Sequence, residues 1–548
     1  METSRSLSEI LPVEQHGDEP ALFFGDDVVT FAQLKQRVTA TARLMSRVSQ
    51  VGDRISIVGP NAPAWIDCYY GVPDSGRLLV FLNDRLAVGE LASIVRRSDS
   101  RVLIGPEQQL NGLRSELGDS VTTIEEAEWE KHLEGCEPQV ESARSLTNSG
   151  QSGAAWIIYT SGTTGVPKGA VLTTENILAA LAGARACRPV RADDVFLFPF
   201  PLCHVAGYNV LHLHAHGRPV VIMRRFESSA FIDAIDRYGV TSASLTATML
   251  SGVLEVISRH PDRRRQLSTL RTLQYGAAPM PTSLVRRAHA ELGVELNQGY
   301  GMTELAGNAV FLDAEAHRHA LDGDERVLRS AGRPAPNVEV AIMSDDGRML
   351  GPEEAGEIVV KGSQVMVGYW DDPEATRSAL RHSWLHTGDV GTMDETGLLF
   401  VVDRKKDLVV SGGENIASRE VEDEILRVAP EVLEVAVVGI PDPHWGENVC
   451  AVVTFSGTAP QGQLDIDALN HRLEPRLARF KLPRHLVSTP ELPKNATGKI
   501  DKKAIRSWLL QERDLIGDRW TSPGARETPQ NKGSGVNGPD ALSLDDVP

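Results

Sequence analysis

The amino-acid sequence predicts an α/β protein with at least two domains: a large N-terminal domain of mixed sheets flanked by helices, and a smaller α+β domain after it. Three observations carry this prediction. The chain has 548 residues, whereas a single hydrophobic core stops growing near roughly 250 to 300 residues. Short apolar runs alternate with longer amphipathic stretches from Ile55 to about Cys450. The composition then changes near Asp403.

The short apolar runs have the length of buried strands. They are ISIV from Ile55, VLI from Val102, WIIY from Trp156, VFLF from Val195 and VVIM from Val220. Runs of this length between amphipathic segments indicate parallel or mixed sheets flanked by helices. No repeat with a period of roughly 20 to 50 residues is present, which argues against a solenoid or a propeller.

The second domain is expected where charge and glycine become concentrated, in VVDRKKDLVVSGGENIASREVEDEIL around Asp403. Strand-like runs AVVGI and VCAVVTF and a basic helical stretch follow. We therefore expect one domain over residues 1–403 and another over residues 404–513. Residues 514–548 are rich in Pro, Gly, Ser and charge and have almost nothing to bury, so they predict a disordered tail.

Composition excludes several classes of protein. With 41% hydrophobic and 24% charged residues the chain is an ordinary globular protein, and its formal net charge of −18 argues against a nucleic-acid partner. The N-terminus lacks the order of a signal peptide, and no stretch approaches the roughly 18 apolar residues of a membrane span. The cysteines show no metal or redox spacing and suggest a reducing cytoplasm; they are Cys68, Cys136, Cys187, Cys203 and Cys450.

The segment WIIYTSGTTGVPKGAVLT has the character of a phosphate-binding loop. Its residues 160–169, apart from Val166, are all Gly, Ser, Thr, Pro or Lys, so the loop cannot pack as core. Glycines let the backbone approach a ligand, hydroxyls and N–H groups offer donors, and Lys168 adds a positive charge. The Walker pattern fails, since Pro167 takes the second glycine's place and Gly169 follows the lysine. An ordinary surface loop is the alternative for this segment taken alone.

The string YTSGTTGVPKG resembles the signature of the adenylate-forming superfamily, which includes acyl-CoA synthetases, peptide-synthetase adenylation domains and firefly luciferase. Further motifs similar to that superfamily follow in order: QYGAAPM from Gln274, QGYGMTE from Gln298, LHTGDVG from Leu385, DRKKD from Asp403 and LPKNATGKI from Leu492. The resemblance extends over residues 22 to 508. It implies a β-barrel-like subdomain in the large domain and a mobile small domain.

The resemblance also implies roles for individual residues. Thr160 and Glu304 would hold Mg²⁺, Asp389 would bind the ribose hydroxyls, Asp403 would be the hinge, and Lys499 would be the catalytic lysine. His204, Thr160 and Glu304 complete the expected catalytic set. The expected ATP and AMP site consists of Thr160, Ser161, Gly162, Thr163, Thr164, Gly165, Lys168, Gly276, Ala277, Ala278, Gln298, Gly299, Tyr300, Gly301, Met302, Thr303, Asp389, Arg404 and Lys499.

Each of these residues taken singly has a structural alternative. Asp389 between two glycines fits a turn, Arg404 fits a solvated charge run, and Tyr300 fits a core position. Their occurrence together and in order favours the functional interpretation.

The implied chemistry is the activation of a carboxylic acid by ATP. A carboxylate is already ionised at neutral pH, so the reaction chiefly needs cations around the α-phosphate. Mg²⁺ and Lys499 fit that need. Coenzyme A would then enter as co-substrate along a channel of Ser411, Gly412 and Gly413. Basic residues available for its phosphates are Lys405, Lys406, Arg472, Arg476, Arg479, Lys481 and Arg484.

The acid itself is expected near FPFPLCHVAGYNV, a segment similar to one that lines the acyl site of the superfamily. The expected pocket residues are His204, Tyr208, Asn209, Ala277, Gly301 and Ala306. No carboxylate occurs in residues 206–210, which argues against an amino-acid substrate. Fatty, aryl and polycyclic acids stay open. The chain departs from the common pattern at LTTEN, residues 172–176, and at Ala417 and Ser418 after SGGENI.

The sequence therefore predicts an acyl-CoA ligase that uses ATP, Mg²⁺ and coenzyme A. Alternatives are an acyl-AMP ligase that loads a carrier protein's phosphopantetheine, a luciferase-like monooxygenase, and a non-catalytic nucleotide sensor. Lys168, Glu304 and Lys499 are all present, which disfavours the sensor. We expect a monomer or homodimer in the cytoplasm.

Overall fold

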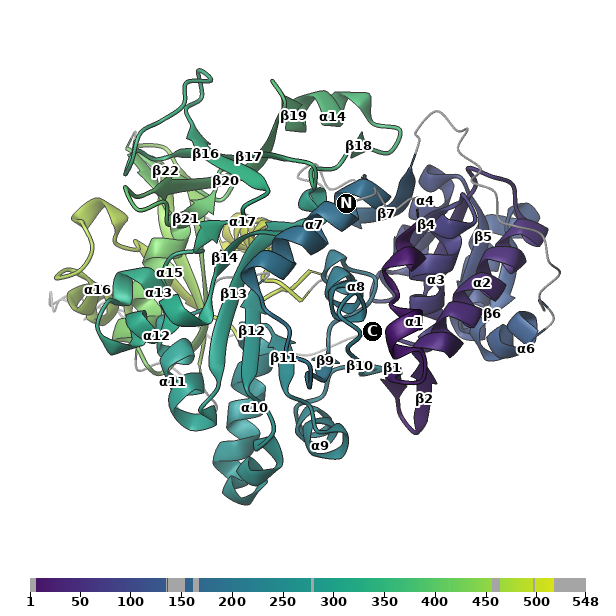
Figure 1. The fold of residues 1–548 in the computed structure, drawn as a ribbon. Coiled ribbons are helices and arrows are strands. Elements are labelled where there is room, and N and C mark those ends of the chain that lie inside the picture. Colours follow the sequence, from purple (N-terminus) through teal and green to yellow (C-terminus); the bar gives the residue numbers. More distant parts are fainter. Residues whose placement is uncertain are drawn as a thin grey trace, which may run out of the picture. The chain divides into compact units, whose positions relative to one another are not determined.

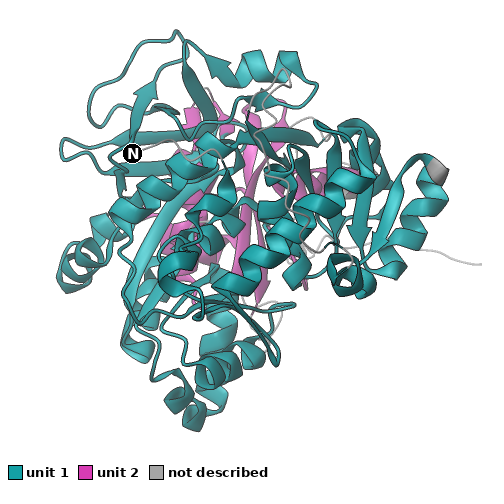
Figure 2. Ribbon diagram, turned by 45° about the vertical axis from the view of Figure 1, so that its right-hand side comes forward, with its two compact units in different colours: residues 1–408, 494–500 teal, residues 409–493, 501–548 magenta. Residues whose placement is uncertain are grey.

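The computed structural model describes residues 6–134, 136, 153–160, 167–276, 280–412, 414–455, 464–495 and 498–516. The chain divides into two compact units, residues 1–408 with 494–500 and residues 409–493 with 501–548 (Figure 2). The segment that contains Lys499 thus belongs with the first unit, whereas the sequence assigned it to the smaller domain. No helix among the described residues is long and apolar enough to cross a membrane.

A seven-stranded sheet forms one half of the first unit. Its strand order is β18 (Gly368–Tyr369), β8 (Lys168–Thr173), β7 (Ala154–Thr160), β4 (Leu78–Leu82), β3 (Arg54–Val58), β5 (Ser100–Gly105) and β6 (Thr122–Glu125). The strands from β7 to β6 are parallel, and β8 and β18 are antiparallel to their neighbours. The apolar runs at Ile55, Val102 and Trp156 are confirmed as strands of this sheet.

Helices cover both faces of this sheet because successive strand residues point to opposite sides. Ile55 and Ile57 pack in the same core cluster as residues of α2 (Phe31–Val48) and α3 (Pro63–Asp74). Val58 packs in another cluster, with residues of α4 (Val88–Ser98) and α5 (Glu107–Leu117). A strand buried on both faces must be apolar throughout, which is why LLVFL in β4 reads as a continuous run.

A nine-stranded sheet forms the other half of the first unit (Figure 1). Its strand order is β15 (Arg333–Pro334), β14 (Gly307–Leu312), β13 (Glu295–Met302), β12 (Thr272–Gly276), β11 (Ser242–Leu245), β9 (Phe196–Phe198), β10 (Val220–Ile222), β1 (Pro20–Phe24) and β2 (Asp27–Thr30). Leu245, Leu273 and Leu296 lie on one face and pack with residues of α9 (Ser228–Tyr238), α10 (Ala247–Arg259) and α11 (Thr282–Leu292). Their strand neighbours face the opposite side.

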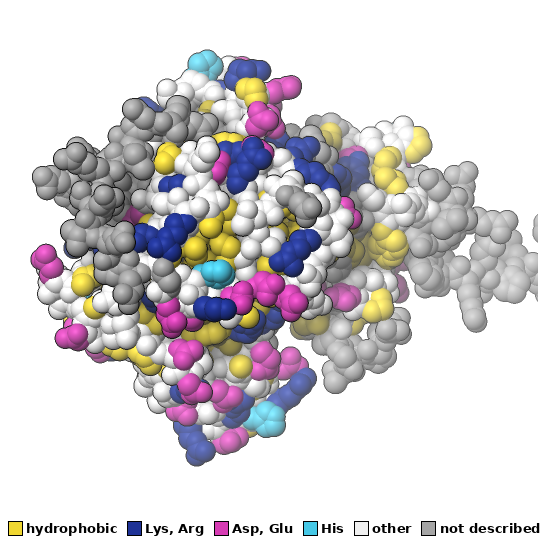
Figure 3. All heavy atoms as spheres, turned by 90° about the vertical axis from the view of Figure 1, so that its right-hand side faces the viewer, with side chains coloured by type: hydrophobic (Ala, Val, Ile, Leu, Met, Phe, Trp, Pro, Cys, Tyr) yellow, Lys and Arg dark blue, Asp and Glu magenta, His cyan; other side chains and the backbone are white. Residues whose placement is uncertain are grey.

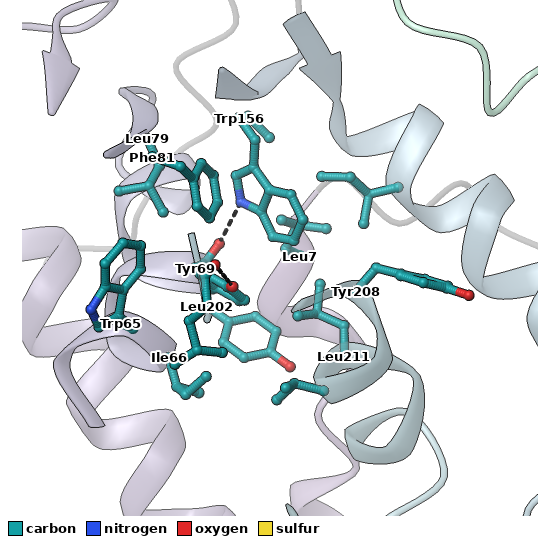
Figure 4. Close-up of a cluster of buried hydrophobic side chains, with 14 of the residues drawn as sticks. Leu7, Trp65, Ile66, Tyr69, Leu79, Phe81, Trp156, Leu202, Tyr208 and Leu211 are labelled. Atoms are coloured by element: carbon teal, nitrogen blue, oxygen red, sulfur yellow. Dashed lines mark hydrogen bonds between the residues drawn. The ribbon is translucent and has the colours of Figure 1, made fainter. Parts of the chain in front are cut away.

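The two sheets share an aromatic core. Tyr69 of α3 lies against Trp156 of β7, with ring centroids 4.9 Å apart, and the Trp156 indole N–H donates to the Tyr69 carbonyl at 3.2 Å (Figure 4). The hydroxyl of Tyr69 donates to the carbonyl of Leu202, in the segment before α8 (Tyr208–His214). This core fixes α8 against the seven-stranded sheet.

Helix α7 (Thr174–Cys187) begins at a capping box. The Thr173 hydroxyl accepts a hydrogen bond from Asn176 N, and Asn176 Oδ1 accepts one from Thr173 N. The LTTEN departure therefore forms the start of a helix, as expected. At its other end α7 is capped by Arg188.

The first unit also contains a five-stranded antiparallel sheet in the place of the expected barrel-like subdomain. It consists of β16 (Val338–Met343), β17 (Gly356–Gly362), β20 (Trp384–Met393) and β19 (Leu380–Arg381), with β21 (Leu399–Arg404) paired to β20. In the described residues its strand order does not close into a ring. The remaining helices of this unit are α1 (Val13–His16), α6 (Trp129–Glu134), α12 (Ala314–Asp322), α13 (Glu325–Leu328), α14 (Pro373–Ala379), and the 3₁₀ helices η1 (Leu7–Ile10), η2 (Gly118–Ser120), η3 (Glu126–Glu128), η4 (Val205–Gly207), η5 (Pro261–Leu267) and η6 (Thr303–Leu305).

The second unit is α+β. Its sheet has the order β23 (Glu414–Ile416), β22 (Val409–Ser411), β25 (Gly446–Phe455) and β24 (Val432–Asp442), with β26 (His485–Ser488) paired to β25. Its helices are α15 (Ser418–Val428), α16 (Ile466–Leu473), α17 (Lys502–Ile516) and η7 (Arg479–Lys481). Val421 and Ile425 of α15 pack with Val437 and Val449 in a core of its own.

Candidate active site

The predicted phosphate loop connects two antiparallel strands of the first unit. Thr160 ends β7, Lys168 begins β8, and these two residues are directly opposite each other in the ladder. The Thr160 hydroxyl donates to the Lys168 carbonyl at 3.5 Å. The loop residues Ser161, Gly162, Thr163, Thr164 and Gly165 lie outside the described residues.

Tyr369 connects Lys168 with Glu304. The Lys168 ammonium is 5.4 Å from the centroid of the Tyr369 ring, and the Tyr369 hydroxyl donates to Glu304 Oε1 at 2.8 Å. Tyr369 lies on β18, which pairs with β8, while Glu304 lies on η6 and is only 7% exposed. Lys168 and Glu304 are 136 positions apart in the chain. They are connected through Tyr369, which belongs to none of the motifs recognised in the sequence.

These residues fit a magnesium ion carried by ATP. Among the described residues no three His, Cys, Asp or Glu side chains gather as a metal site. Mg²⁺ in nucleotide sites is commonly held by one or two protein oxygens together with phosphate oxygens and water. The buried Glu304 carboxylate, oriented by Tyr369, and the Thr160 hydroxyl supply ligands of that kind.

Asp389 lies at the centre of a second group. The Tyr300 hydroxyl donates to Asp389 Oδ2 at 2.8 Å, and Arg404 Nε lies 3.3 Å from Asp389 Oδ1. Asp389 and Arg404 are directly opposite each other on β20 and β21. Burial raises the pKa of Asp389, and the Arg404 charge and the Tyr300 hydrogen bond oppose that rise. Thr387 accepts a hydrogen bond from Asp389 N at 3.1 Å, which fixes the backbone there.

The expected hinge residue precedes Arg404 in the same strand. Asp403 is opposite Val390, is buried, and accepts a hydrogen bond from Arg404 N at 2.7 Å. The boundary between the two units follows five residues later, after Leu408.

Lys499 lies in a short turn of the first unit. Asn495 N donates to the Lys499 carbonyl at 2.8 Å, and Asn495 Oδ1 accepts from Lys499 N at 3.1 Å. The residue is exposed, so water reaches part of it, and the surrounding protein lowers the pKa of its ammonium to about 8. Desolvation is the main cause and the Arg404 charge adds to it, whereas Asp389 and Glu304 act in the opposite direction.

His204 completes this group. Desolvation, followed by the positive charge of Lys499, lowers the pKa of His204 to about 4, so its imidazole is neutral. Its Nε2 atom is buried without a partner among the described residues. Lys499 is thus within electrostatic reach of His204, Glu304, Asp389 and Arg404, residues that the sequence could only place in order.

Three predicted glycines lie where neighbouring groups approach the backbone closely. Gly276 is opposite Gly299 in the sheet, and a Cβ on Gly276 would lie 2.4 Å from the Gly299 carbonyl oxygen. A Cβ on Gly299 would lie 1.9 Å from Asn308 Nδ2, and one on Gly301 would lie 2.0 Å from the Gly307 carbonyl oxygen. At Gly276 and Gly301 a side chain would meet backbone atoms, so the close packing there depends on glycine. Ala277 and Ala278 lie outside the described residues, and Gln298, Met302 and Thr303 continue β13 into η6.

The expected acyl residues lie beside these glycines. Tyr208 begins α8 and is buried, and its ring packs 3.0 Å from the Cβ position of Gly307. Asn209 is buried, and Ala306 is buried with φ of 53°. The sequence missed Arg188, which bonds to the Tyr208 hydroxyl. A lone arginine after a helix carries no recognisable pattern, so only tertiary structure reveals it.

The residues expected to line the coenzyme A channel belong to the second unit. Ser411 is buried at the end of β22. Gly412 has φ of 61°, and a Cβ there would lie 2.9 Å from the Trp445 ring. Gly413 lies outside the described residues.

The fold and the grouping of Lys499, Asp389 and Glu304 are those expected of the adenylate-forming superfamily. A profile described as "AMP-binding enzyme" matches residues 12–370, and one described as "AMP-binding enzyme C-terminal domain" matches residues 420–499. The chain belongs to the AMP-binding enzyme family.

Individual relatives agree with this assignment. The chain is 35% identical to a feruloyl-CoA synthase of Amycolatopsis sp. over 490 residues, which are 89% of this chain and 95% of the relative. The structure of o-succinylbenzoate CoA synthetase (MenE) from Bacillus subtilis with an acyl-adenylate aligns with a TM-score of 0.79 at 29% identity, covering 92% of this chain and 98% of that one. The same enzyme has been solved with ATP and a magnesium ion.

A third relative has a different activity in its name. The amide bond synthetase McbA from Marinactinospora thermotolerans aligns with a TM-score of 0.79 at 30% identity, covering 92% of this chain and 99% of McbA. The predicted superfamily, the α/β fold and the class of AMP-forming acid–thiol ligases are confirmed by these comparisons.

Proposed function

We propose that this enzyme activates a carboxylic acid with ATP and Mg²⁺ and transfers the acyl group to the thiol of coenzyme A. The observation that carries the proposal is the position of Lys499 in the first unit, in the electrostatic environment of Glu304, Asp389 and Arg404. A cation there interacts with Asp389 of the expected ribose site and with Glu304 of the expected magnesium site.

In the first half-reaction an oxygen of the acid carboxylate attacks the α-phosphorus. The bond from the α-phosphorus to the bridging oxygen breaks, and its electron pair leaves with pyrophosphate. Lys499 neutralises charge that develops at the α-phosphate, and Asp389 holds the ribose while Tyr300 and Arg404 orient the carboxylate. A magnesium ion held by Glu304 and Thr160 would neutralise charge on the phosphate oxygens.

In the second half-reaction the thiol of coenzyme A gives its proton to water, its sulfur attacks the acyl carbon, and AMP leaves with the electron pair of the C–O bond. Neutral His204 lies in the same group and can orient the acyl carbonyl without adding charge. We further propose that Asp403 is the hinge and that the thiol enters along a channel of Ser411, Gly412 and Gly413. Cytoplasmic location also remains a proposal.

A hollow on the first unit has a lining of mixed charge: Arg54, Arg96, Arg97, Asp99, Trp370 and Asp371. Arg54 is paired with Asp99, and its guanidinium lies 5.3 Å from the Trp370 ring centroid. Arginines beside an aromatic ring suit the phosphates and base of a nucleotide. Figure 3 shows Lys and Arg side chains beside Asp and Glu on one face, so the net charge of −18 does not make that surface uniformly acidic.

The second candidate is amide synthesis, in which an amine attacks the acyl-adenylate. The likeness to McbA favours it, because that enzyme is as similar to this chain as MenE is. Both candidates share the first half-reaction and differ only in the acceptor.

The test is an acid panel with ATP and Mg²⁺, assayed for pyrophosphate and for product with coenzyme A, a carrier protein or an amine as acceptor. Formation of acyl-CoA supports the proposal. Amide formation without thioester formation would replace it with the second candidate, and absence of pyrophosphate with every acid would reject acid activation itself.

A variant separates the two half-reactions. Lys499→Ala should lose adenylate formation and keep thioester formation from a supplied acyl-adenylate. Lys503→Ala is the matched control, since it removes an exposed lysine of α17. Equal loss of both half-reactions in Lys499→Ala would contradict the assigned role of the lysine.

A further inference from the structure

A buried arginine beside the expected acyl residues points to the chemistry of the substrate. Arg188 is 6% exposed, and its Nη1 donates to Gln274 Oε1 at 2.6 Å while its Nη2 donates to the Tyr208 hydroxyl. Its guanidinium carbon lies 5.2 Å from the Phe311 ring centroid and 5.5 Å from that of Tyr208. All of these partners are uncharged.

The positive charge of Arg188 is therefore not neutralised within the described part of the chain. No described carboxylate forms an ion pair with it, and its Nε atom is buried without a partner there. Arg37, by contrast, is neutralised by Asp67 at 2.8 Å. The equally buried Arg77 also lacks an ion pair with any described residue, but it donates to the backbone carbonyls of Ser49 and Ser75. A buried charge without a counter-charge is strongly unfavourable, so a protein that keeps one commonly uses it to bind a ligand.

Strand register places the partners of this arginine beside the glycines expected to bind the nucleotide. Gln274 lies two residues before Gly276 and therefore points to the same face. Phe311 is opposite Gly299, and Ser244 is opposite Gln274 and donates to its Oε1 at 3.3 Å. Two strand residues span about 7 Å, so Gln274 lies about that far from Gly276 along β12.

Further unpartnered polar atoms belong to α8, the helix of Tyr208. Among the described residues, buried side-chain atoms without a hydrogen bond include Arg188 Nε, Asn209 Oδ1 and both ring nitrogens of His212. Tyr208 and His212 are one turn apart on α8 and so share a face. Burial, followed by the Arg188 charge, lowers the pKa of His212 well below its ordinary value, so this ring is neutral. Arg188 supplies the positive charge of this polar group.

We infer that Arg188 binds a second carboxylate at the far end of the acid substrate, so that the enzyme activates one carboxyl group of a dicarboxylic acid. The inference rests on the proposed function and specifies its substrate class. The near carboxylate attacks the α-phosphorus, and the far one stays ionised against the guanidinium. A purely hydrocarbon tail would leave the buried charge unpaired and is selected against.

The test compares matched acids on one aryl or alkyl skeleton, carrying hydrogen, hydroxyl or carboxylate at the far end. Pyrophosphate release with ATP and Mg²⁺ gives kcat/KM for each acid. We expect the diacid to exceed the unsubstituted monoacid by at least about tenfold, in line with the strength of charge-assisted hydrogen bonds. Equal values, or a preference for the hydroxy acid, would overturn the inference.

Two variants and a control test whether Arg188 is the residue that binds the far carboxylate. Arg188→Met should lower the ratio of diacid to monoacid roughly 10- to 100-fold. Gln274→Glu places a carboxylate beside the guanidinium and should lower the same ratio while retaining the arginine. Arg77→Met is the control, because Arg77 is equally buried at 4% exposed but donates to Ser49 and Ser75. It should leave the ratio unchanged.

The diacid and the monoacid are assayed on the same protein preparation. A loss of folded protein therefore lowers both kcat/KM values equally and leaves their ratio unchanged. A ratio that falls equally in Arg77→Met, or stays constant in both Arg188→Met and Gln274→Glu, would refute the assignment. If no acid at all releases pyrophosphate, acid activation fails; if acids react without the expected ratio, only the carboxylate subsite fails.

Discussion

The pH dependence of the first half-reaction follows from the environment of Lys499. The pKa of its ammonium is lowered from 10.5 to about 8, so the positive charge is lost as pH rises through about 8. In the free enzyme about nine-tenths of the molecules carry the charge at pH 7 and about one-tenth at pH 9. If Lys499 neutralises the α-phosphate, kcat/KM for ATP should fall roughly tenfold over this range.

An unperturbed lysine would give a different curve. With a pKa of 10.5, the charged fraction would fall by only about 3% between pH 7 and pH 9. Bound ATP adds negative charge near the ammonium and favours its protonated form, so the fall in kcat should occur at higher pH than the fall in kcat/KM.

The assay is pyrophosphate release at saturating acid and limiting ATP, across buffers of equal ionic strength. Lys499→Arg keeps a positive charge throughout the range and should remove the fall, whatever its absolute rate. A flat wild-type profile, or the same fall in Lys499→Arg, would refute the reasoning.

Three further predictions concern single contacts. Asp389→Asn removes the charge that Arg404 neutralises and should raise KM for ATP at least about tenfold; an unchanged KM would contradict the ribose role. Tyr369→Phe removes the hydrogen bond to Glu304 and should raise the Mg²⁺ concentration for half-maximal rate roughly tenfold; an unchanged Mg²⁺ titration would dissociate Tyr369 from the metal site. Asp67→Ala leaves Arg37 without a buried partner and should cost about 3 kcal/mol of stability, seen as a lower midpoint of thermal unfolding, while KM values stay constant; altered KM values at an unchanged midpoint would argue against a structural role.

The sequence predicted the strands well because their signal is local. Apolar runs at Ile55, Trp156 and Val220 are strands in the structure, and LLVFL forms β4. Two compact units were expected, and the structure contains two, although it groups the Lys499 turn with the first unit. Such a grouping depends on contacts between residues that are far apart in the sequence, and local composition does not predict those contacts.

The site could be predicted in part. Short motifs with a recognisable pattern contain Glu304, Asp389, Arg404 and Lys499, so the sequence alone predicts each of these residues. Tyr369 and Arg188 belong to no such motif. Their significance comes from a hydroxyl 2.8 Å from Glu304 and from a guanidinium without a counter-charge, and both depend on packing.

The sequence by itself determined the family of this chain, because each motif that carries the resemblance to the adenylate-forming superfamily consists of residues close together in the chain. Only the tertiary structure decided what surrounds Arg188. Its neighbours come from α8 and from the strands β12 and β14. Burial removes water from these groups, so the charge of Arg188 depends on the partners that packing supplies, which the sequence does not reveal.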